Sequence, residues 1–183
     1  MIKHFKQFIT EPMWLAGIVV VAYLLDFIIP IDFNRYGIHP RSFWGLFGIP
    51  LSPFLHGGFG HLFSNLFPLF VLAVLLRTHG KNLFLKATTA LIGISGFLTW
   101  LLSSAVVVGA SGLVFAYWTF LITTAIRQRT IKTIVIAGVT LLLYGGLIFG
   151  LASFREGVSW AGHFSGAVAG VILAFIMPIR DDA

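Results

Sequence analysis

The stretch HFSGAVAGVILAFIMPI, residues 163–179, decides the fold class, because it contains no Lys, Arg, Asp or Glu. A run of this length and composition is typical of a helix that crosses the hydrocarbon core of a membrane. A helix is expected because backbone groups in lipid need hydrogen-bond partners within their own segment. Five further apolar segments precede it, at residues 13–29, 62–76, 83–102, 111–126 and 131–151. The sequence therefore predicts an all-α integral membrane protein, folded as a six-transmembrane-helix bundle.

The composition of the whole chain agrees with this prediction. Of its 183 residues, 58% are hydrophobic and 10% are charged, and the mean hydropathy is +0.97. A soluble domain could not bury so much apolar surface, so the lipid bilayer is the first expected partner. Six spans with short loops use nearly the whole chain, which predicts one domain at residues 13–179 between short tails at 1–12 and 180–183.

The charge and the cysteine content exclude several classes of function. The net charge is +6, but the 12 Lys and Arg residues are spread through apolar sequence and form no basic patch with interleaved aromatic residues. We therefore expect no nucleic acid partner. The chain has no cysteine, which excludes disulfides, thiolate nucleophiles and cysteine-ligated metals. Any nucleophile must be an oxygen, and we expect neither a metal nor a cofactor.

The charges between the segments predict the orientation of the bundle. Basic residues concentrate in the amino-terminal tail and in the loops after the second and fourth segments, as Lys3, Lys6, Arg77, Lys81, Lys86, Arg127, Arg129 and Lys132. Cytoplasmic loops are enriched in Lys and Arg, so these regions should lie inside. The loop after the fifth segment balances Arg155 against Glu156. Both termini are thus predicted to be cytoplasmic, which places the first loop, residues 31–60, outside in spite of Arg35 and Arg41.

Three polar clusters, far apart in the sequence, fall on the outer side in this topology. They are FLHGGFGHLFSN at residues 54–65, GASG at 109–112 and WAGHFSG at 160–166. His61 and Asn65 are four residues apart, so on a helix they share a face and can donate hydrogen bonds toward one point. Taken alone, such a pair can hold neighbouring helices together, and GASG can mark a close helix crossing. The convergence of all three clusters favours a functional site.

Small residues in the last segment favour close packing around His163. Gly162, Gly166 and Gly170 recur every four residues, and the last two share a helix face with His163. A helix that packs against these glycines would be brought against the imidazole. If that helix is the fourth segment, Ser111 meets His163.

Such a meeting would supply the chemistry of a serine nucleophile. A serine hydroxyl needs a base to take its proton, and neutral imidazole can do so near neutral pH. His61, Asn65 and the Ser111 backbone N–H could donate to the oxyanion of a tetrahedral intermediate. None of the six acidic residues stands where it would obviously orient His163, so a Ser111–His163 dyad is expected in place of a triad.

With these residues, the sequence resembles the rhomboid family of intramembrane serine proteases over essentially its entire length. The resemblance rests on an ordered combination: HGGFGHLFSN at 56–65, then GASG opening a span, then GHFSGAVAG in the last span. It implies that Ser111 is the nucleophile and that His163 is the general base and acid. It further implies that His61 and Asn65 form the oxyanion site, with His56 as an additional histidine nearby.

The resemblance also implies supporting positions and leaves one region open. An aromatic ring is expected beside His163 at Phe115, where tyrosine is common in the family, and close backbone packing is expected at Gly109, Gly112, Gly166 and Gly170. A Trp-Arg element known from the first loop of some members is not evident. Arg41 and Trp44 stand nearby in a different arrangement, so their role stays open.

The substrate implied by the resemblance is a membrane-anchored protein cut within or beside its transmembrane helix. Two other functions remain open: a catalytically silent rhomboid-like chaperone or binding module, and a small transporter whose path is lined by the same polar residues. The short tails favour a multi-pass protein of a prokaryotic cell (inner) membrane. The natural substrate, the cleavage-site preference and the oligomeric state are not predicted.

Overall fold

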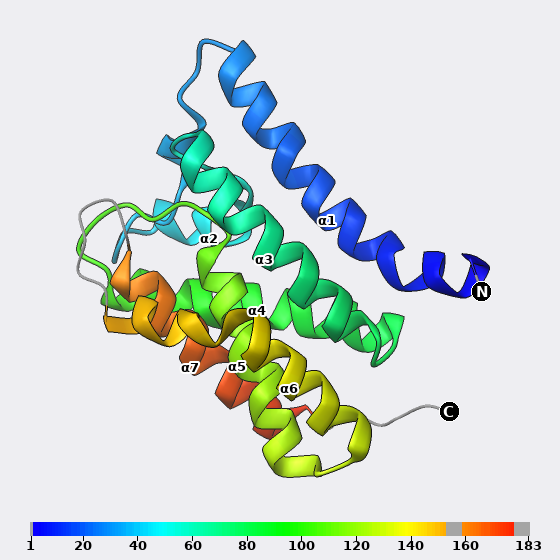
Figure 1. Ribbon diagram of the computed structural model, residues 1–183. Helices are drawn as coiled ribbons and strands as arrows, with labels where there is room; N and C mark the ends of the chain where they lie inside the picture. Colours follow the sequence, from blue (N-terminus) through cyan, green and yellow to red (C-terminus); the bar gives the residue numbers. More distant parts are fainter. Residues whose placement is uncertain (1, 153–158, 178–183) are drawn as a thin grey trace.

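A computed structural model of the chain describes residues 2–152 and 159–177, which are mainly helical (Figure 1). The long helices are α1 (Ile2–Ile28), α3 (Phe59–Arg77), α4 (Lys81–Leu102), α5 (Ser111–Gln128), α6 (Ile131–Tyr144) and α7 (Trp160–Ile176). The short elements are α2 (Gly48–Leu51) and the 3-10 helices η1 (Phe33–Tyr36), η2 (Trp44–Leu46), η3 (Ser52–Phe54) and η4 (Gly145–Ala152). The all-α fold predicted from the sequence is therefore confirmed.

Within the described residues, four helical segments are long and apolar enough to cross a membrane, at residues 7–28, 59–77, 81–102 and 131–151. The last of these segments consists of α6 and most of η4. Helix α7 is also apolar but shorter. These segments support a multi-pass membrane protein, while the predicted count of six spans and the orientation of the termini stay predictions. The loop with Arg155 and Glu156, the predicted span end at 178–179 and the tail at 180–183 lie outside the described residues.

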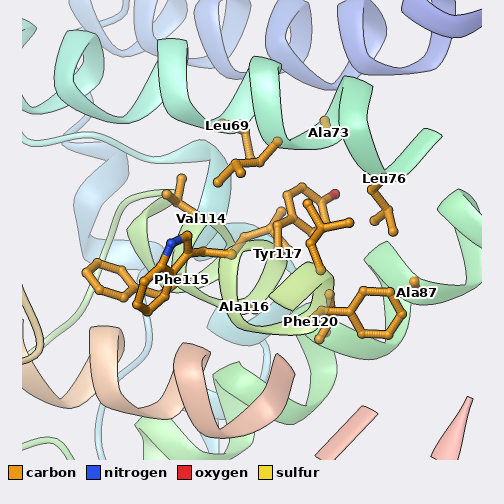
Figure 2. Packing of buried hydrophobic residues seen from close by; sticks show 14 of the residues in the cluster. Leu69, Ala73, Leu76, Ala87, Val114, Phe115, Ala116, Tyr117 and Phe120 are labelled. Atoms are coloured by element: carbon orange, nitrogen blue, oxygen red, sulfur yellow. The ribbon is translucent and has the colours of Figure 1, made fainter. Parts of the chain in front are cut away.

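Helix α5 lies at the centre of the bundle, in contact with α3, α4, α6 and α7. Figure 2 shows Leu69 and Leu76 of α3 facing Tyr117 and Phe120 of α5, and all four side chains are fully buried. The Tyr117 hydroxyl lies 2.7 Å from the Thr88 hydroxyl of α4, so the one polar end of this ring is hydrogen-bonded. A helix enclosed by protein need not be as apolar as one that faces lipid. This explains why α5 carries tyrosine, tryptophan and threonine and is not among the four segments above.

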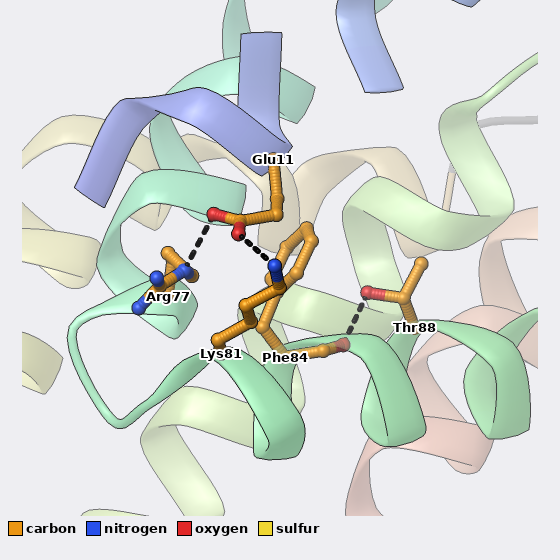
Figure 3. A network of polar contacts seen from close by, with 5 residues as sticks. All are labelled: Glu11, Arg77, Lys81, Phe84 and Thr88. Carbon is orange, nitrogen blue, oxygen red and sulfur yellow. Dashed lines mark hydrogen bonds and ion pairs between the residues drawn. The ribbon is translucent and has the colours of Figure 1, made fainter. Parts of the chain in front are cut away.

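Helix α1 lies along α3 and is joined to the turn between α3 and α4 by charged groups. Arg77 donates to Glu11 at 2.8 Å, and the Lys81 ammonium lies 3.3 Å from the other carboxylate oxygen (Figure 3). The side chains of Arg77 and Glu11 are only 10% and 15% exposed. A buried charge of this kind depends on its partner, so the pair fixes where α1 meets the bundle.

The first loop contacts the end of α4 and the segment that precedes α5. The Arg41 guanidinium donates to the carbonyl oxygens of Leu101 at 3.0 Å and Ser103 at 2.7 Å, so it satisfies backbone acceptors where α4 ends. Ile38 and Val107 form an antiparallel β-bridge. Arg41 thus has a structural role that the sequence left open, whereas Trp44 is 77% exposed.

Candidate active site

A cavity of about 850 Å³ lies at the end of the bundle where α5 and α7 begin, and part of the predicted site lines it. Ser111, His163, His61 and Asn65 all contribute to its walls, and so does Phe115. These residues come from three helices, α3, α5 and α7. The structure therefore brings together side chains that are separated by up to 102 positions in the sequence, 163 minus 61.

Ser111 is the first residue of α5, and the backbone before it strongly favours glycine. Gly109 has a φ of +111°, in the region that side chains rarely adopt. Its N–H donates to the Ser52 carbonyl oxygen at 2.8 Å, which ties this segment to the first loop. Ser111 itself is half-buried at the helix N-terminus, where backbone N–H groups have no helical acceptors and can serve an anion.

Helix α7 approaches α5 closely at two glycines. A Cβ on Gly166 would collide with the carbonyl oxygen of Gly112, and a Cβ on Gly170 would collide with that of Ala116. The neighbouring Thr119 hydroxyl donates across the interface to the Ala167 carbonyl oxygen at 2.8 Å. The partner of the glycine stripe is therefore the helix of Ser111, and His163 lies one turn before the crossing.

Two contacts hold the imidazole of His163. The ring stacks on Phe115, with centroids 4.3 Å apart and planes inclined by 20°. Its Nδ1 lies 3.2 Å from the backbone carbonyl oxygen of Gly150 in η4. A carbonyl can only accept a hydrogen bond, so this contact favours the tautomer with the proton on Nδ1, in which Nε2 keeps the lone pair that a base requires.

His61 and Asn65 lie on one face of α3 and border the cavity, as their spacing predicts. The Asn65 side-chain nitrogen donates to the His61 carbonyl oxygen at 2.7 Å, one helical turn back. This bond uses one of the two amide protons and fixes the side chain, which is 5% exposed. The second proton remains as a donor for a ligand in the cavity.

His56 does not line the cavity, although its ring packs against that of His61 with centroids 5.1 Å apart. It is 2% exposed, and its Nε2 accepts a long hydrogen bond of 3.4 Å from the N–H of Ala110. Burial, followed by the proximity of His61, lowers the pKa of His56 to about 4. His56 is thus neutral at physiological pH, and its contacts are with His61 and Ala110.

Sequence reasoning missed the residues that support the site through backbone atoms. Gly150 contacts His163, the Ser52 carbonyl accepts from Gly109, and Val107 pairs with Ile38 of the first loop. Every residue has a backbone carbonyl, so no residue type indicates which carbonyls support the site. The remaining signal is Gly150 in GGLIFGLA, residues 145–152, because glycine permits the backbone to approach another group closely.

Comparisons with known proteins cover most of the chain. A family model described as the Rhomboid domain matches residues 40–180. An uncharacterized protein of Mycobacterium tuberculosis is 35% identical over 186 residues, which cover 91% of this chain and 78% of that protein. An uncharacterized protein of Mycobacterium leprae is 30% identical over 183 residues, or 90% of this chain and 72% of that protein. Rhomboid-like protein 11, chloroplastic, of Arabidopsis thaliana is 26% identical over 182 residues, or 90% of this chain and 64% of that protein.

Proposed function

Because the chain belongs to the rhomboid family, we propose that it is a serine endopeptidase that cleaves membrane-anchored proteins within or beside their transmembrane helix. The observation that carries the proposal is the cavity shared by Ser111 and His163, with donors from α3 on its wall. The arrangement of His163, with Nδ1 on a carbonyl oxygen and the ring stacked on Phe115, supports a base that acts through Nε2.

In the first half of the reaction, the Ser111 hydroxyl oxygen attacks the carbonyl carbon of the scissile peptide bond. His163 Nε2 takes the hydroxyl proton, and the carbonyl oxygen becomes an oxyanion. The tetrahedral intermediate collapses when the C–N bond breaks and His163 returns the proton to the leaving amine. The products of this half are an acyl-serine and a released fragment that carries a new amino terminus.

The oxyanion is stabilised by hydrogen-bond donors near the N-terminus of α5. We assign the Ser111 backbone N–H, the Asn65 amide and the His61 ring to this role. One such donor contributes about 3 to 4 kcal/mol of transition-state stabilisation when it is preorganised and shielded from water. The internal bond from Asn65 to the His61 carbonyl holds the amide in place before substrate arrives.

In the second half, water attacks the acyl carbon while His163 takes its proton. The intermediate collapses as the ester bond between the acyl carbon and the Ser111 oxygen breaks, His163 protonates that oxygen, and the other fragment leaves with a new carboxyl terminus. A cavity of about 850 Å³ provides room for both water and an unwound stretch of substrate. Unwinding is needed because a helical turn shields its own peptide bonds, and it favours substrates with helix-weakening residues near the cleavage site.

The proposal also includes a membrane topology that places Ser111 and His163 on the same side of the membrane. We infer six spans at residues 13–179, with both termini in the cytoplasm and the cavity on the opposite side, in a prokaryotic cell membrane. The loop charges support this orientation. The relatives in Mycobacterium support a bacterial setting. The partners are transmembrane substrates and lipid.

The proposal is tested by labelling with a fluorophosphonate, which reacts with activated serine hydroxyls. Wild-type protein in detergent should be labelled at Ser111 and should cleave a transmembrane model substrate. Ser111→Ala should lose both properties and keep its melting temperature, because removing one hydroxyl creates little void. Ser165→Ala is the matched control, since this buried serine of α7 has no hydrogen-bond partner among the described residues and should be dispensable. A folded wild-type protein that neither reacts nor cleaves would support the silent binding module instead.

A further inference from the structure

The carbonyl of Gly150 contacts the edge of the His163 ring at a place where a triad protease has a carboxylate. Gly150 belongs to η4, in which the chain leaves α6 and continues as a tighter 3-10 helix. The distance from Nδ1 to the carbonyl oxygen is 3.2 Å. Runs of 3-10 helix longer than about four residues are uncommon, and η4 spans 8 residues.

Glycine is favoured at this position by the ring on the other side of the contact. A Cβ on Gly150 would lie 2.7 Å from Cζ of Phe115 and 3.7 Å from Nδ1 of His163. The first distance is shorter than real Cβ contacts, so a side chain would displace either η4 or Phe115. Gly150, Phe115 and His163 thus form one contact unit, in which the aromatic ring fixes the plane of the imidazole and the carbonyl fixes its edge.

Carboxylates are engaged elsewhere in the described part of the chain. Glu11 pairs with basic side chains near the other end of α3. Asp26 accepts from the N–H of Phe33, and Asp32 caps η1. Within residues 2–152 and 159–177, the hydrogen-bond partner of the His163 side chain is therefore a neutral dipole.

We propose that the Gly150 carbonyl is a positioning group that holds His163 as the tautomer with its proton on Nδ1. This role rests on the proposed function, because it prepares Nε2 to take the Ser111 proton. In a Ser–His–Asp triad the aspartate fixes the tautomer and also stabilises the imidazolium by its charge. The carbonyl supplies the first of these effects fully and the second only through its dipole. The catalytic unit is accordingly a Ser–His dyad oriented by a backbone acceptor.

The first test uses two alanine substitutions within η4. Gly150→Ala should lower turnover by roughly tenfold or more, because the new methyl group separates η4 from Phe115 and lengthens the bond to His163. Gly146→Ala is the matched control, since a Cβ there meets nothing within 4 Å. Equal turnover of the two variants would contradict the proposal.

The second test changes the acceptor and leaves every side chain in place. Leucic acid introduced at Leu151 replaces the peptide bond after Gly150 by an ester, whose carbonyl is a weaker acceptor. The same substitution at Leu147 weakens the Gly146 carbonyl and is a close control, because both sites are Gly-Leu bonds within η4. We expect turnover to fall roughly tenfold for the ester at 151, equivalent to about 1.4 kcal/mol, and to stay near wild type for the ester at 147.

The tautomer itself is read from the ¹⁵N shifts of His163, which distinguish protonation on Nδ1 from protonation on Nε2. Wild type should show the Nδ1–H form, and the ester at 151 should show a mixture. This readout does not require activity, so it separates the two proposals: a protein inert to fluorophosphonate could still show the fixed tautomer. Protonation on Nε2 in wild type, or an unchanged tautomer in the ester at 151, would overturn the role of Gly150.

Discussion

The backbone of Gly109 lies directly against the imidazole of His61. A Cβ built on Gly109 would be 2.6 Å from both Cε1 and Nε2 of that ring. The same glycine has a φ of +111° and stands two residues before Ser111. The segment that positions the proposed nucleophile therefore also positions a proposed oxyanion donor, and one residue controls both.

Gly109→Ala should damage the site more than the fold. The methyl group must push away either His61 or the segment before Ser111, and the positive φ adds strain of about 1 to 3 kcal/mol. We expect turnover to fall by roughly two orders of magnitude, with a lower melting temperature. Gly93→Ala on α4 is the control, because a Cβ there meets no atom within 4 Å. Turnover at the wild-type level in Gly109→Ala would show that this contact does not matter.

His163→Ala should eliminate turnover nearly as completely as Ser111→Ala, because neither residue of a dyad functions without the other. The double variant should then be no slower than either single variant. Turnover and melting temperature are measured on the same preparations, so that loss of activity can be separated from loss of fold. A stable His163→Ala protein with normal turnover would eliminate the dyad.

Asn65→Ala should leave measurable cleavage. Asn65 is one donor among several, so its loss should lower turnover by roughly two to three orders of magnitude at most, with substrate binding less affected. Comparison of kcat with KM on a transmembrane peptide checks this. If Asn65 serves only to bridge helices, the melting temperature will fall and turnover will fall only in proportion.

His56 should make stability depend on pH. Its pKa is about 4 in the folded protein, below the ordinary value near 6.5, so the unfolded chain binds more protons between these values. The contribution is complete above about pH 6.5 and is lost as the pH falls toward about 4. Melting temperatures of wild type and His56→Gln, measured from about pH 7.5 to about pH 4.5, should therefore converge as the pH falls. A constant difference would mean that His56 is not the responsible group.

The proposed orientation can be checked with reporter fusions. Fusions after residues 80 and 130 should report the cytoplasm, and fusions after residues 105 and 157 should report the other side, because of the loop charges. If the fusions after residues 105 and 157 report different sides, Ser111 and His163 lie on opposite sides of the membrane. That result would contradict the proposed dyad.

The helices were predictable because hydropathy is a local property. The apolar segment predicted at 83–102 corresponds to α4 at Lys81–Leu102, and that at 131–151 corresponds to α6 with η4. The first loop was not predictable, because its structure depends on partners distant in the sequence. Arg41, for example, reaches the end of α4, about 60 residues later.

The side chains of the site were predictable in type and spacing, whereas the backbone groups that hold them were not. The glycine stripe of α7 indicated a close helix neighbour, and that neighbour is α5. His56 was expected near the oxyanion site, but only the structure shows that it lies behind the cavity wall, against Ala110. Residue spacing does not show which side of a ring faces the cavity. The position of His56 behind the wall was therefore not predictable from the sequence.

The pairing of Glu11 with Arg77 has a consequence for how the chain is made. Its two members lie 66 residues apart, so Glu11 is synthesised well before Arg77. Until then α1 carries an acidic group without this neighbour. The contact that fixes where α1 meets the bundle can therefore form only after the end of α3 has been synthesised.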